Sequence, residues 1–471
     1  MTLTLRHQLS NRSPGPQPRP RHGPGLTSSR RGLLALLALL GPLGSGIGPN
    51  PATAGAAPSP IDPATGEASA LPAGPDARFE TQAVANAPML NIAGKGFGHG
   101  RGMGQWGALG YTTAWRIPYP VVLDHFYGGT SAGIVNSDFD IKVRLNAHDN
   151  KPFVVAADAG NLMTSITGNE KYRTVLFQPE PDGRWTVWAG GDCAGSWGWW
   201  AVGQTTGQVK FWIDGADQAA QDRSQWFAMC TSDGLRYYRG TGETVRTPVR
   251  TGVVNNVNVE LYLRAVVPRE MPASWGDREW PWGIQALAAQ AVAARSYVLT
   301  EERAPSYWHT CDYAACQVYG GAATWDPVNG GRLLEDARSN EAVINTRGEV
   351  RVRPDGSTAR TEYSASTGGH TAGGAFPAVV DQGDPLPDNP NYRWTYQVSA
   401  KALQDAFPTI GTLTKITVTG RNGLGEWGGR VTEVRLEGTT GVAVTDGDTV
   451  NFYLGLGTDW FDVLSLTSGT G

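Results

Sequence analysis

The sequence VVPREMPASW occupies residues 266–275, and ALAAQAVAARSY follows at residues 286–297. In and around the second run, apolar residues recur three or four positions apart, as they do along one face of an α-helix. These residues are Ile284, Leu287, Ala288, Ala291, Val292 and Val298. The spacing predicts a helix over residues 282–302, and its small alanines would let neighbouring elements pack closely against it.

A single carboxylate, Glu270, stands between Pro268 and Pro272 in the first run, beside Met271 and Trp275. Proline fixes φ and disfavours a helix around it, so we expect Glu270 to lie on a stiff loop. Apolar neighbours disfavour the charged carboxylate and would raise its pKa, as a general acid at neutral pH requires. The same spacing also fits a structural glutamate that pairs with an arginine.

Three further segments accompany these runs: GFGHGRGMGQWGA at residues 96–108, CQVYGG at 316–321 and EYSASTGGHT at 362–371. Together the segments resemble the stage II sporulation protein D family, also called the amidase-enhancer family. In many members of that family the Gly-His-Gly segment follows the Ser-Gly-Gly segment, whereas here it comes first. If the site is shared, the chain is permuted, and residues 96–108 should still reach the same cleft.

The resemblance implies an exported peptidoglycan lytic transglycosylase. Such an enzyme cleaves the bond between N-acetylmuramic acid and N-acetylglucosamine and leaves a 1,6-anhydro end. The C6 hydroxyl of the sugar attacks, so one carboxylate suffices as acid and then base, whereas most hydrolases need two. Glu270 is the predicted catalytic residue. Predicted substrate-binding residues lie in the matched segments: Gln290, Arg295, Tyr297, Tyr319, Ser364, Ser366, His99, Gln105 and Trp106.

Two alternatives stay open. The chain could be a non-catalytic cell-wall binder that enhances an amidase, as the second family name suggests. It could also be a muramidase hydrolase, with Asp312 or Glu362 as a second carboxylate. For Arg295, contact with a lactyl or acetamido oxygen of the substrate and a pairing with Glu270 are both open. Peptidoglycan glycan strands are the expected partner in each case, with a cell-wall amidase as a further candidate.

The amino terminus has the composition of a targeting segment. Six arginines precede the first acidic residue, Asp62, and a short apolar run from Leu33 ends at Gly41. We predict a twin-arginine-like signal peptide over residues 1–57 and a linker over 58–85. Cleavage removes six of 39 basic residues and none of 43 acidic ones, so the exported chain is more acidic than the net −4 of the whole. That charge argues against nucleic acid as a partner, and no later segment is apolar enough to span a membrane.

The pattern of apolar runs predicts an α+β fold with an all-β accessory module. We expect a Gly-rich segment of the core at 86–135, the accessory module at 136–240, the catalytic core at 241–395 and a C-terminal β region completing the core at 396–471. Dense glycine predicts little regular structure at 94–110. Predicted helices are 120–127 and 333–342, and predicted strands are 245–250, 257–263, 350–353 and 361–366, with a hairpin at 413–419 and 430–436.

Four cysteines fit an exported protein. The simplest pairing joins Cys193 to Cys230 and Cys311 to Cys316, although sequence alone leaves three connectivities open. No cofactor or metal is expected. Zinc held by His309, Cys311 and Cys316 is the alternative for the second pair, without an identified fourth ligand.

Overall fold

The computed structural model describes residues 87–301 and 307–467. The predicted signal peptide and linker lie outside the described residues. Within them the fold is α+β, as predicted, with helices and several sheets. None of the helices in these ranges is both long and apolar enough to cross a membrane.

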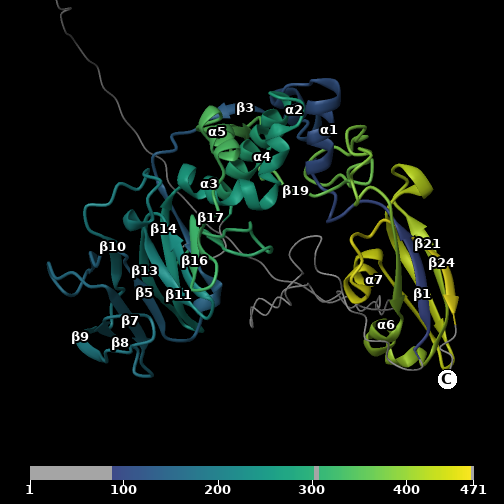
Figure 1. Ribbon diagram of the computed structural model, residues 1–471. Coiled ribbons are helices and arrows are strands. Elements are labelled where there is room, and N and C mark those ends of the chain that lie inside the picture. Colours follow the sequence, from purple (N-terminus) through teal and green to yellow (C-terminus); the bar gives the residue numbers. More distant parts are fainter. Residues whose placement is uncertain (1–86, 302–306, 468–471) are drawn as a thin grey trace, which may run out of the picture. The chain divides into compact units, whose positions relative to one another are not determined.

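Two mainly antiparallel sheets face each other in the β-rich part (Figure 1). The first has the strand order β15 (Thr310–Cys311), β4 (Asp140–Arg144), β14 (Arg250–Asn258), β13 (Thr241–Thr247), β10 (Lys210–Ile213), β6 (Leu162–Thr164). The second has the order β17 (Gly330–Leu333), β16 (Ala323–Asp326), β12 (Gly234–Tyr238), β11 (Phe227–Thr231), β5 (Phe153–Ala156), β7 (Thr174–Pro179), β8 (Trp185–Gly190), β9 (Trp199–Thr205). Phe211 of the first sheet packs against Phe177 and Phe227 of the second, each with ring centroids 5.2 Å apart. These contacts place an aromatic core between the sheets.

Strands from both sides of residue 240 share these two sheets. β13 and β14 pair with β10 and β4, and β16 pairs with β12. The β-rich segment 136–240 therefore completes its sheets only with strands from the segment that follows it.

The predicted strand 257–263 is wrong beyond Asn258. There β14 ends and helix α3 (Val259–Glu270) begins, because the Asn258 side chain accepts a hydrogen bond from the Glu260 N–H as an N-cap. The β-branched and aromatic residues that suggested a strand are instead buried on the helix. Tertiary burial overrides local strand propensity at this point.

Helix α4 (Trp282–Leu299) is the predicted alanine-rich helix, and it is buried on nearly every side. It contacts α1 (Gln105–Trp115), α2 (Tyr119–Phe126), α3 and α5 (Ala337–Asn345) (Figure 1). Alanines at most of its contact positions let these helices approach closely. The predicted helix 120–127 corresponds to α2. The predicted helix 333–342 starts later, because β17 extends to Leu333 and Asp336 caps α5.

Glycine density misled the prediction for residues 94–110, since α1 begins at Gln105. Its glycines are needed for close packing. A Cβ at Gly107 would lie 2.2 Å from Asp381 Oδ2, and one at Gly110 would lie 1.9 Å from the Gly383 carbonyl oxygen. Two short pairings join this part to later segments: β2 (Met103–Gly104) with β19 (Tyr363–Ser364), and β3 (Ser131–Ile134) with β18 (Glu349–Val352). The predicted strand 361–366 is reduced to the two residues of β19.

The C-terminal region has a separate hydrophobic core, to which β1 (Met89–Gly94) contributes Leu90 and Ile92. One sheet has the order β20 (Trp394–Ser399), β1, β24 (Phe461–Thr467), and the other has the order β21 (Leu413–Arg421), β22 (Val431–Gly438), β23 (Val442–Thr445). Helices α6 (Lys401–Ala406) and α7 (Gly447–Leu454) contact each other, and α7 also packs on β22. The predicted hairpin is present as β21 and β22.

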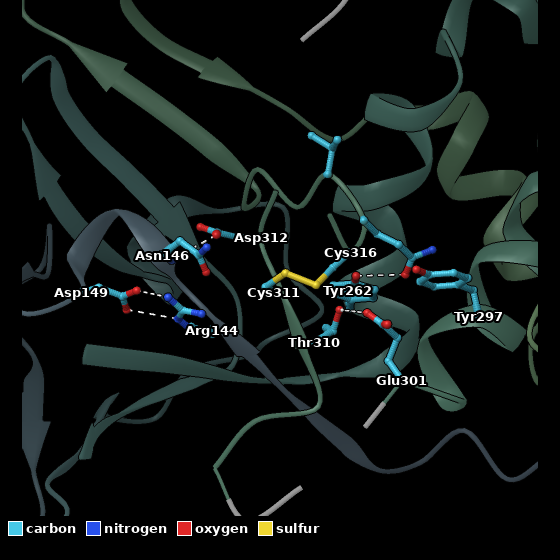
Figure 2. The surroundings of a disulfide bond; sticks show 12 residues. Arg144, Asn146, Asp149, Tyr262, Tyr297, Glu301, Thr310, Cys311, Asp312 and Cys316 are labelled. Carbon is cyan, nitrogen blue, oxygen red and sulfur yellow. Dashed lines mark hydrogen bonds and ion pairs between the residues drawn. A yellow bond between two sulfur atoms is a disulfide. The ribbon is translucent and has the colours of Figure 1, made fainter. Parts of the chain in front are cut away.

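Two disulfides occur in the pairing expected from the sequence. Cys193 bonds to Cys230 with Cα atoms 5.8 Å apart, and Cys311 bonds to Cys316 with Cα atoms 5.6 Å apart. Figure 2 shows the second bond. The zinc alternative would require both of its sulfurs as thiolates, and His309 Nδ1 accepts the backbone N–H of Lys142.

Candidate functional site

Glu270 is the last residue of α3, and Pro268 lies inside the helix. The prediction that the two prolines place Glu270 on a loop is therefore wrong. Pro268 removes one N–H near the end of the helix, where little of the hydrogen-bond ladder remains. The next bond is intact, from the Met271 N–H to the Val267 carbonyl at 3.0 Å, and Pro272 follows as the helix stops.

The residue Glu270 is half-buried, and its carboxyl group is desolvated in an apolar surrounding. Met271 is fully buried and Trp275 is 7% exposed. The Val318 backbone N–H donates to Glu270 Oε1 at 2.6 Å. Burial raises the pKa of Glu270 to about 7, while hydrogen bonds from Val318 and the Tyr363 hydroxyl act in the opposite direction. The carboxyl group is consequently present in both protonation states near neutral pH, which suits a group that gives up a proton and takes one back.

A chain of hydrogen bonds fixes the groups around this carboxyl. Gln317 Nε2 donates to the Tyr363 hydroxyl at 2.9 Å, and the Tyr262 hydroxyl donates to Gln317 Oε1 at 3.1 Å. Tyr262 lies on α3, beside the Cys311–Cys316 disulfide in Figure 2. Three separate segments of the sequence thus meet at Glu270. Tyr363 was missed as a candidate although it lies in the quoted segment 362–371, because its link to Glu270 and Gln317 joins separate segments of the sequence.

The Gly-rich segment 96–108 packs against these elements. Met103 pairs with Tyr363 in the β2–β19 ladder, and Gln105 Nε2 donates to Gln290 Oε1 at 3.2 Å. The Trp106 ring lies 4.5 Å from the Trp275 ring, centroid to centroid. The early position of segment 96–108 in the sequence therefore does not prevent contact between this segment and the elements around Glu270.

His99 belongs to a neighbouring cluster. Its Nδ1 accepts the Arg101 backbone N–H at 2.9 Å, and desolvation followed by the charge of Arg101 lowers its pKa to about 4. The imidazole is therefore neutral at neutral pH. Arg101 forms a bidentate ion pair with Glu362 at 2.9 and 3.1 Å. Within residues 87–301 and 307–467, no hydrogen bond joins His99 to Glu270.

Several predicted substrate-binding residues are core residues instead. Arg295 is fully buried and forms a bidentate ion pair with Glu260, so the prediction that it contacts substrate or Glu270 is wrong. The Ser366 hydroxyl donates to Asp384 Oδ2 at 2.7 Å, and the Tyr319 hydroxyl donates to Asn255 Oδ1 at 2.7 Å. Both are buried and occupied inside the protein, which corrects their assignment to a cleft.

The remaining predicted residues differ in exposure. Gln290 and Ser364 are buried, and Gln290 Nε2 and Ser364 Oγ have no hydrogen-bond partner among residues 87–301 and 307–467. Tyr297 is half-buried, and its hydroxyl accepts a hydrogen bond from Arg360 Nη2 at 2.7 Å. Trp106 is half-buried against Trp275.

Asp312, one of the two carboxyl groups considered for a hydrolase, has a raised pKa. Its Oδ1 accepts the Asn146 backbone N–H at 3.0 Å, drawn in Figure 2. Burial raises its pKa to about 6. Glu362, the second alternative, is held by Arg101, and its pKa is lowered. Of the two carboxyl groups considered for a hydrolase, Asp312 is thus the one able to take part in proton transfer near neutral pH.

Glu270 lines neither of two open cavities that lie among the described residues. One of about 380 Å³ is lined by Thr113, Ala114, Arg116 and Glu279. The other, of about 460 Å³, lies in the C-terminal region and includes Trp427. Glu270 is instead a half-buried group at the surface.

The raised pKa of Glu270 predicts a pH-dependent stability. Between 4.5 and about 7 the folded chain binds more protons here than the unfolded chain does. The carboxyl group therefore favours the folded state fully below pH 4.5, and this contribution is lost as the pH rises to 7. At ~1.4 kcal/mol per pKa unit, the loss is on the order of 3 kcal/mol. Glu270→Gln should thus be more stable than the wild type at pH 8 and gain little at pH 4, as measured by urea unfolding. An equal difference at both pH values would contradict the raised pKa.

Comparison with known proteins gives one family match and two curated relatives. Residues 248–352 match the family model described as Stage II sporulation protein. The chain is 33% identical over 147 residues to the protein of Bacillus subtilis named Amidase enhancer. The aligned residues cover 30% of this chain and 17% of that protein. It is 33% identical over 144 residues to an uncharacterized protein of Brachyspira hyodysenteriae, covering 30% of this chain and 34% of that protein.

The chain therefore spans between about a sixth and a third of the length of these relatives. The matched residues 248–352 include Glu270 and the segment 316–321, whereas 96–108 and 362–371 lie outside the match. The family resemblance inferred from the sequence is supported over this part of the chain.

Proposed function

We propose that this protein is an exported peptidoglycan lytic transglycosylase in which Glu270 is the acid and base. The observation that supports this most directly is the desolvated Glu270 carboxyl group, whose pKa is raised to about 7. It lies where α3, segment 316–321 and β19 meet, inside the part that matches the sporulation protein family. A general acid works best when its pKa is near the working pH.

In the proposed reaction, protonated Glu270 gives its proton to the glycosidic oxygen as the bond from that oxygen to C1 of N-acetylmuramic acid breaks. The C6 hydroxyl of the same sugar attacks C1, and its proton passes to the Glu270 carboxylate. The products are an N-acetylglucosamine hydroxyl end and a 1,6-anhydro end, with no net consumption of water. Glu270 returns to its protonated state for the next turnover.

The groups around Glu270 have positioning roles in this proposal. The Val318 N–H binds Oε1 and fixes the orientation of the carboxyl group. Tyr363, held by Gln317, stabilises the carboxylate after proton transfer. Charge-assisted hydrogen bonds of this kind are stronger than neutral ones, so they keep the pKa from rising further.

The test is digestion of purified peptidoglycan followed by mass analysis of the products. We expect muropeptides that end in 1,6-anhydro-N-acetylmuramic acid, because the internal C6 hydroxyl is the nucleophile. A hydrolase would instead add one water at each cleaved bond and leave a reducing end. Each fragment would then be about 18 mass units heavier than its 1,6-anhydro counterpart. Reducing ends would favour the muramidase, with Asp312 as its second carboxylate.

A second function is favoured by the name of the Bacillus subtilis relative, Amidase enhancer. In that alternative the chain binds the cell wall and stimulates an amidase without cleaving glycan itself. The two functions separate in one experiment, in which a purified cell-wall amidase is assayed with wild type and with Glu270→Gln. A binder stimulates the amidase equally in both forms and releases no glycan fragments alone.

A further inference from the structure

We propose that the C-terminal region carries a second saccharide-binding site, in the cavity where Trp427 lies. The cavity measures about 460 Å³, which falls within the usual size range of small-molecule sites. It is bounded by β21 and β24 and includes Thr417, Arg421 and Asp462 in addition to Trp427. None of these residues belongs to the hydrogen-bond network of Glu270.

Trp427 is displayed at the surface by an unfavourable backbone conformation. Its φ is +57° and its ψ is 14°, a left-handed conformation that bulky residues rarely adopt. Its side chain is nevertheless 38% exposed, so burial of the indole does not explain the strain. Strained residues that persist in folded proteins cluster at ligand sites, where the surrounding structure holds them in place.

The loop around Trp427 is anchored from several sides. The Glu426 carboxylate forms an ion pair with Lys95 at 3.0 Å and a second ion pair with Arg393. The Trp460 indole N–H donates to the Glu426 carbonyl at 3.2 Å. The Arg393 guanidinium lies 5.8 Å from the Trp427 ring centroid. The indole is therefore held in position before any ligand arrives, which reduces the entropy cost of binding.

The chemistry of the cavity suits a pyranose ring. An exposed indole offers a flat apolar face for the C–H face of a sugar, and polar groups beside it can bind the hydroxyls. Asp462 is 53% exposed, and its Oδ1 accepts from Arg421 Nη2 at 3.2 Å. Arg421 also donates to the Gly429 carbonyl at 2.8 Å, which ties the polar wall to the Trp427 loop. An acidic and a basic group in one wall can bind a hydroxyl as acceptor and donor.

The choice of ligand rests on the proposed function, whereas the site itself does not. If the protein acts on glycan strands, a second site that binds N-acetylhexosamine units would keep it attached to the strand between cleavages. Under the two proposals together, the strand binds at two places and is cleaved only at Glu270.

The test uses the full exported chain carrying Glu270→Gln, so that glycan is not consumed. Binding to an N-acetylglucosamine oligosaccharide is measured by calorimetry and binding to insoluble peptidoglycan by sedimentation. We expect Trp427→Asn to weaken both by roughly tenfold, the effect of losing about 1.4 kcal/mol of ring contact. Asparagine tolerates the left-handed conformation, so the melting temperature should stay the same or rise. Trp427→Tyr keeps a flat ring and should retain much of the binding.

Trp197→Ala is the matched control, because Trp197 is 82% exposed on a different part of the fold and belongs to the β-rich segment. It should bind as the parent does. Unchanged binding in Trp427→Asn would overturn the proposal, as would a loss that appears only in Trp197→Ala. A lower melting temperature with unchanged binding would mean that Trp427 serves the fold alone. The product analysis of the wild type tests cleavage separately, so either proposal can fail without the other.

Discussion

Replacing Glu270 with Gln should lower glycan cleavage by at least about 100-fold, the lower end of what general acid–base catalysis contributes. Glutamine has the shape of glutamate and can still accept the Val318 N–H, so the site keeps its geometry. It cannot give a proton to the leaving oxygen. Release of soluble fragments from purified peptidoglycan measures the effect, and sedimentation with the same material should show binding retained.

Asp312→Asn is the control for this experiment. Asparagine keeps an oxygen that can accept the Asn146 N–H, and only the titrating group is lost. A lytic reaction with a single carboxylate should proceed at nearly the wild-type rate in this variant. A fall comparable to that of Glu270→Gln would point to two carboxylates and a hydrolase. Full activity in Glu270→Gln would exclude Glu270 as the acid.

Replacing Arg295 with Met should destabilise the protein by about 3–5 kcal/mol, the cost of breaking a buried ion pair. Arg295 is fully buried, and its partner Glu260 would be left with an uncompensated charge. The guanidinium also donates to the Glu349 carbonyl at 3.0 Å, so it joins α4, α3 and the start of β18. Urea unfolding measures the change.

Two variants make this prediction specific. Lys401→Ala removes an exposed pair with Asp405 and should change stability by less than about 1 kcal/mol. The double variant Glu260→Leu and Arg295→Met removes both buried charges and should recover much of the stability lost in Arg295→Met alone. A stable Arg295→Met variant with weakened glycan binding would restore the substrate role that the structure contradicts.

Patterns local to one segment were predicted well from the sequence. The start of α4, helix α2, the β21–β22 hairpin and the two cysteine pairs followed from spacing and composition. The apolar neighbours of Glu270 correctly indicated a raised pKa. Most of these depend on residues that are close in sequence, where propensity and periodicity carry the information. Cys193 and Cys230, 37 positions apart, are the exception.

The errors have two sources: a rule for proline applied too strictly within one segment, and contacts with other elements. Proline rules placed Glu270 on a loop, but they do not forbid a proline so near the last turn of a helix. The glycines of α1 read as loop residues because their neighbour, the 381–383 segment, is more than 270 positions away. Arg295 was read as a ligand because its partner Glu260 lies on another helix. For the α1 glycines and for Arg295, the deciding neighbour lies on another element of the fold.

The central position of β1 between β20 and β24 bears on the order in which the chain can fold. Asn91 of β1 binds Ser465 of β24, 374 positions further along. During synthesis at roughly 5–20 residues per second, β1 emerges long before either neighbour exists. Until then its backbone N–H and C=O groups are an open strand edge that other chains can pair with. The C-terminal sheet therefore completes last, and a chaperone that shields residues 89–94 would have its greatest effect before the final strand appears.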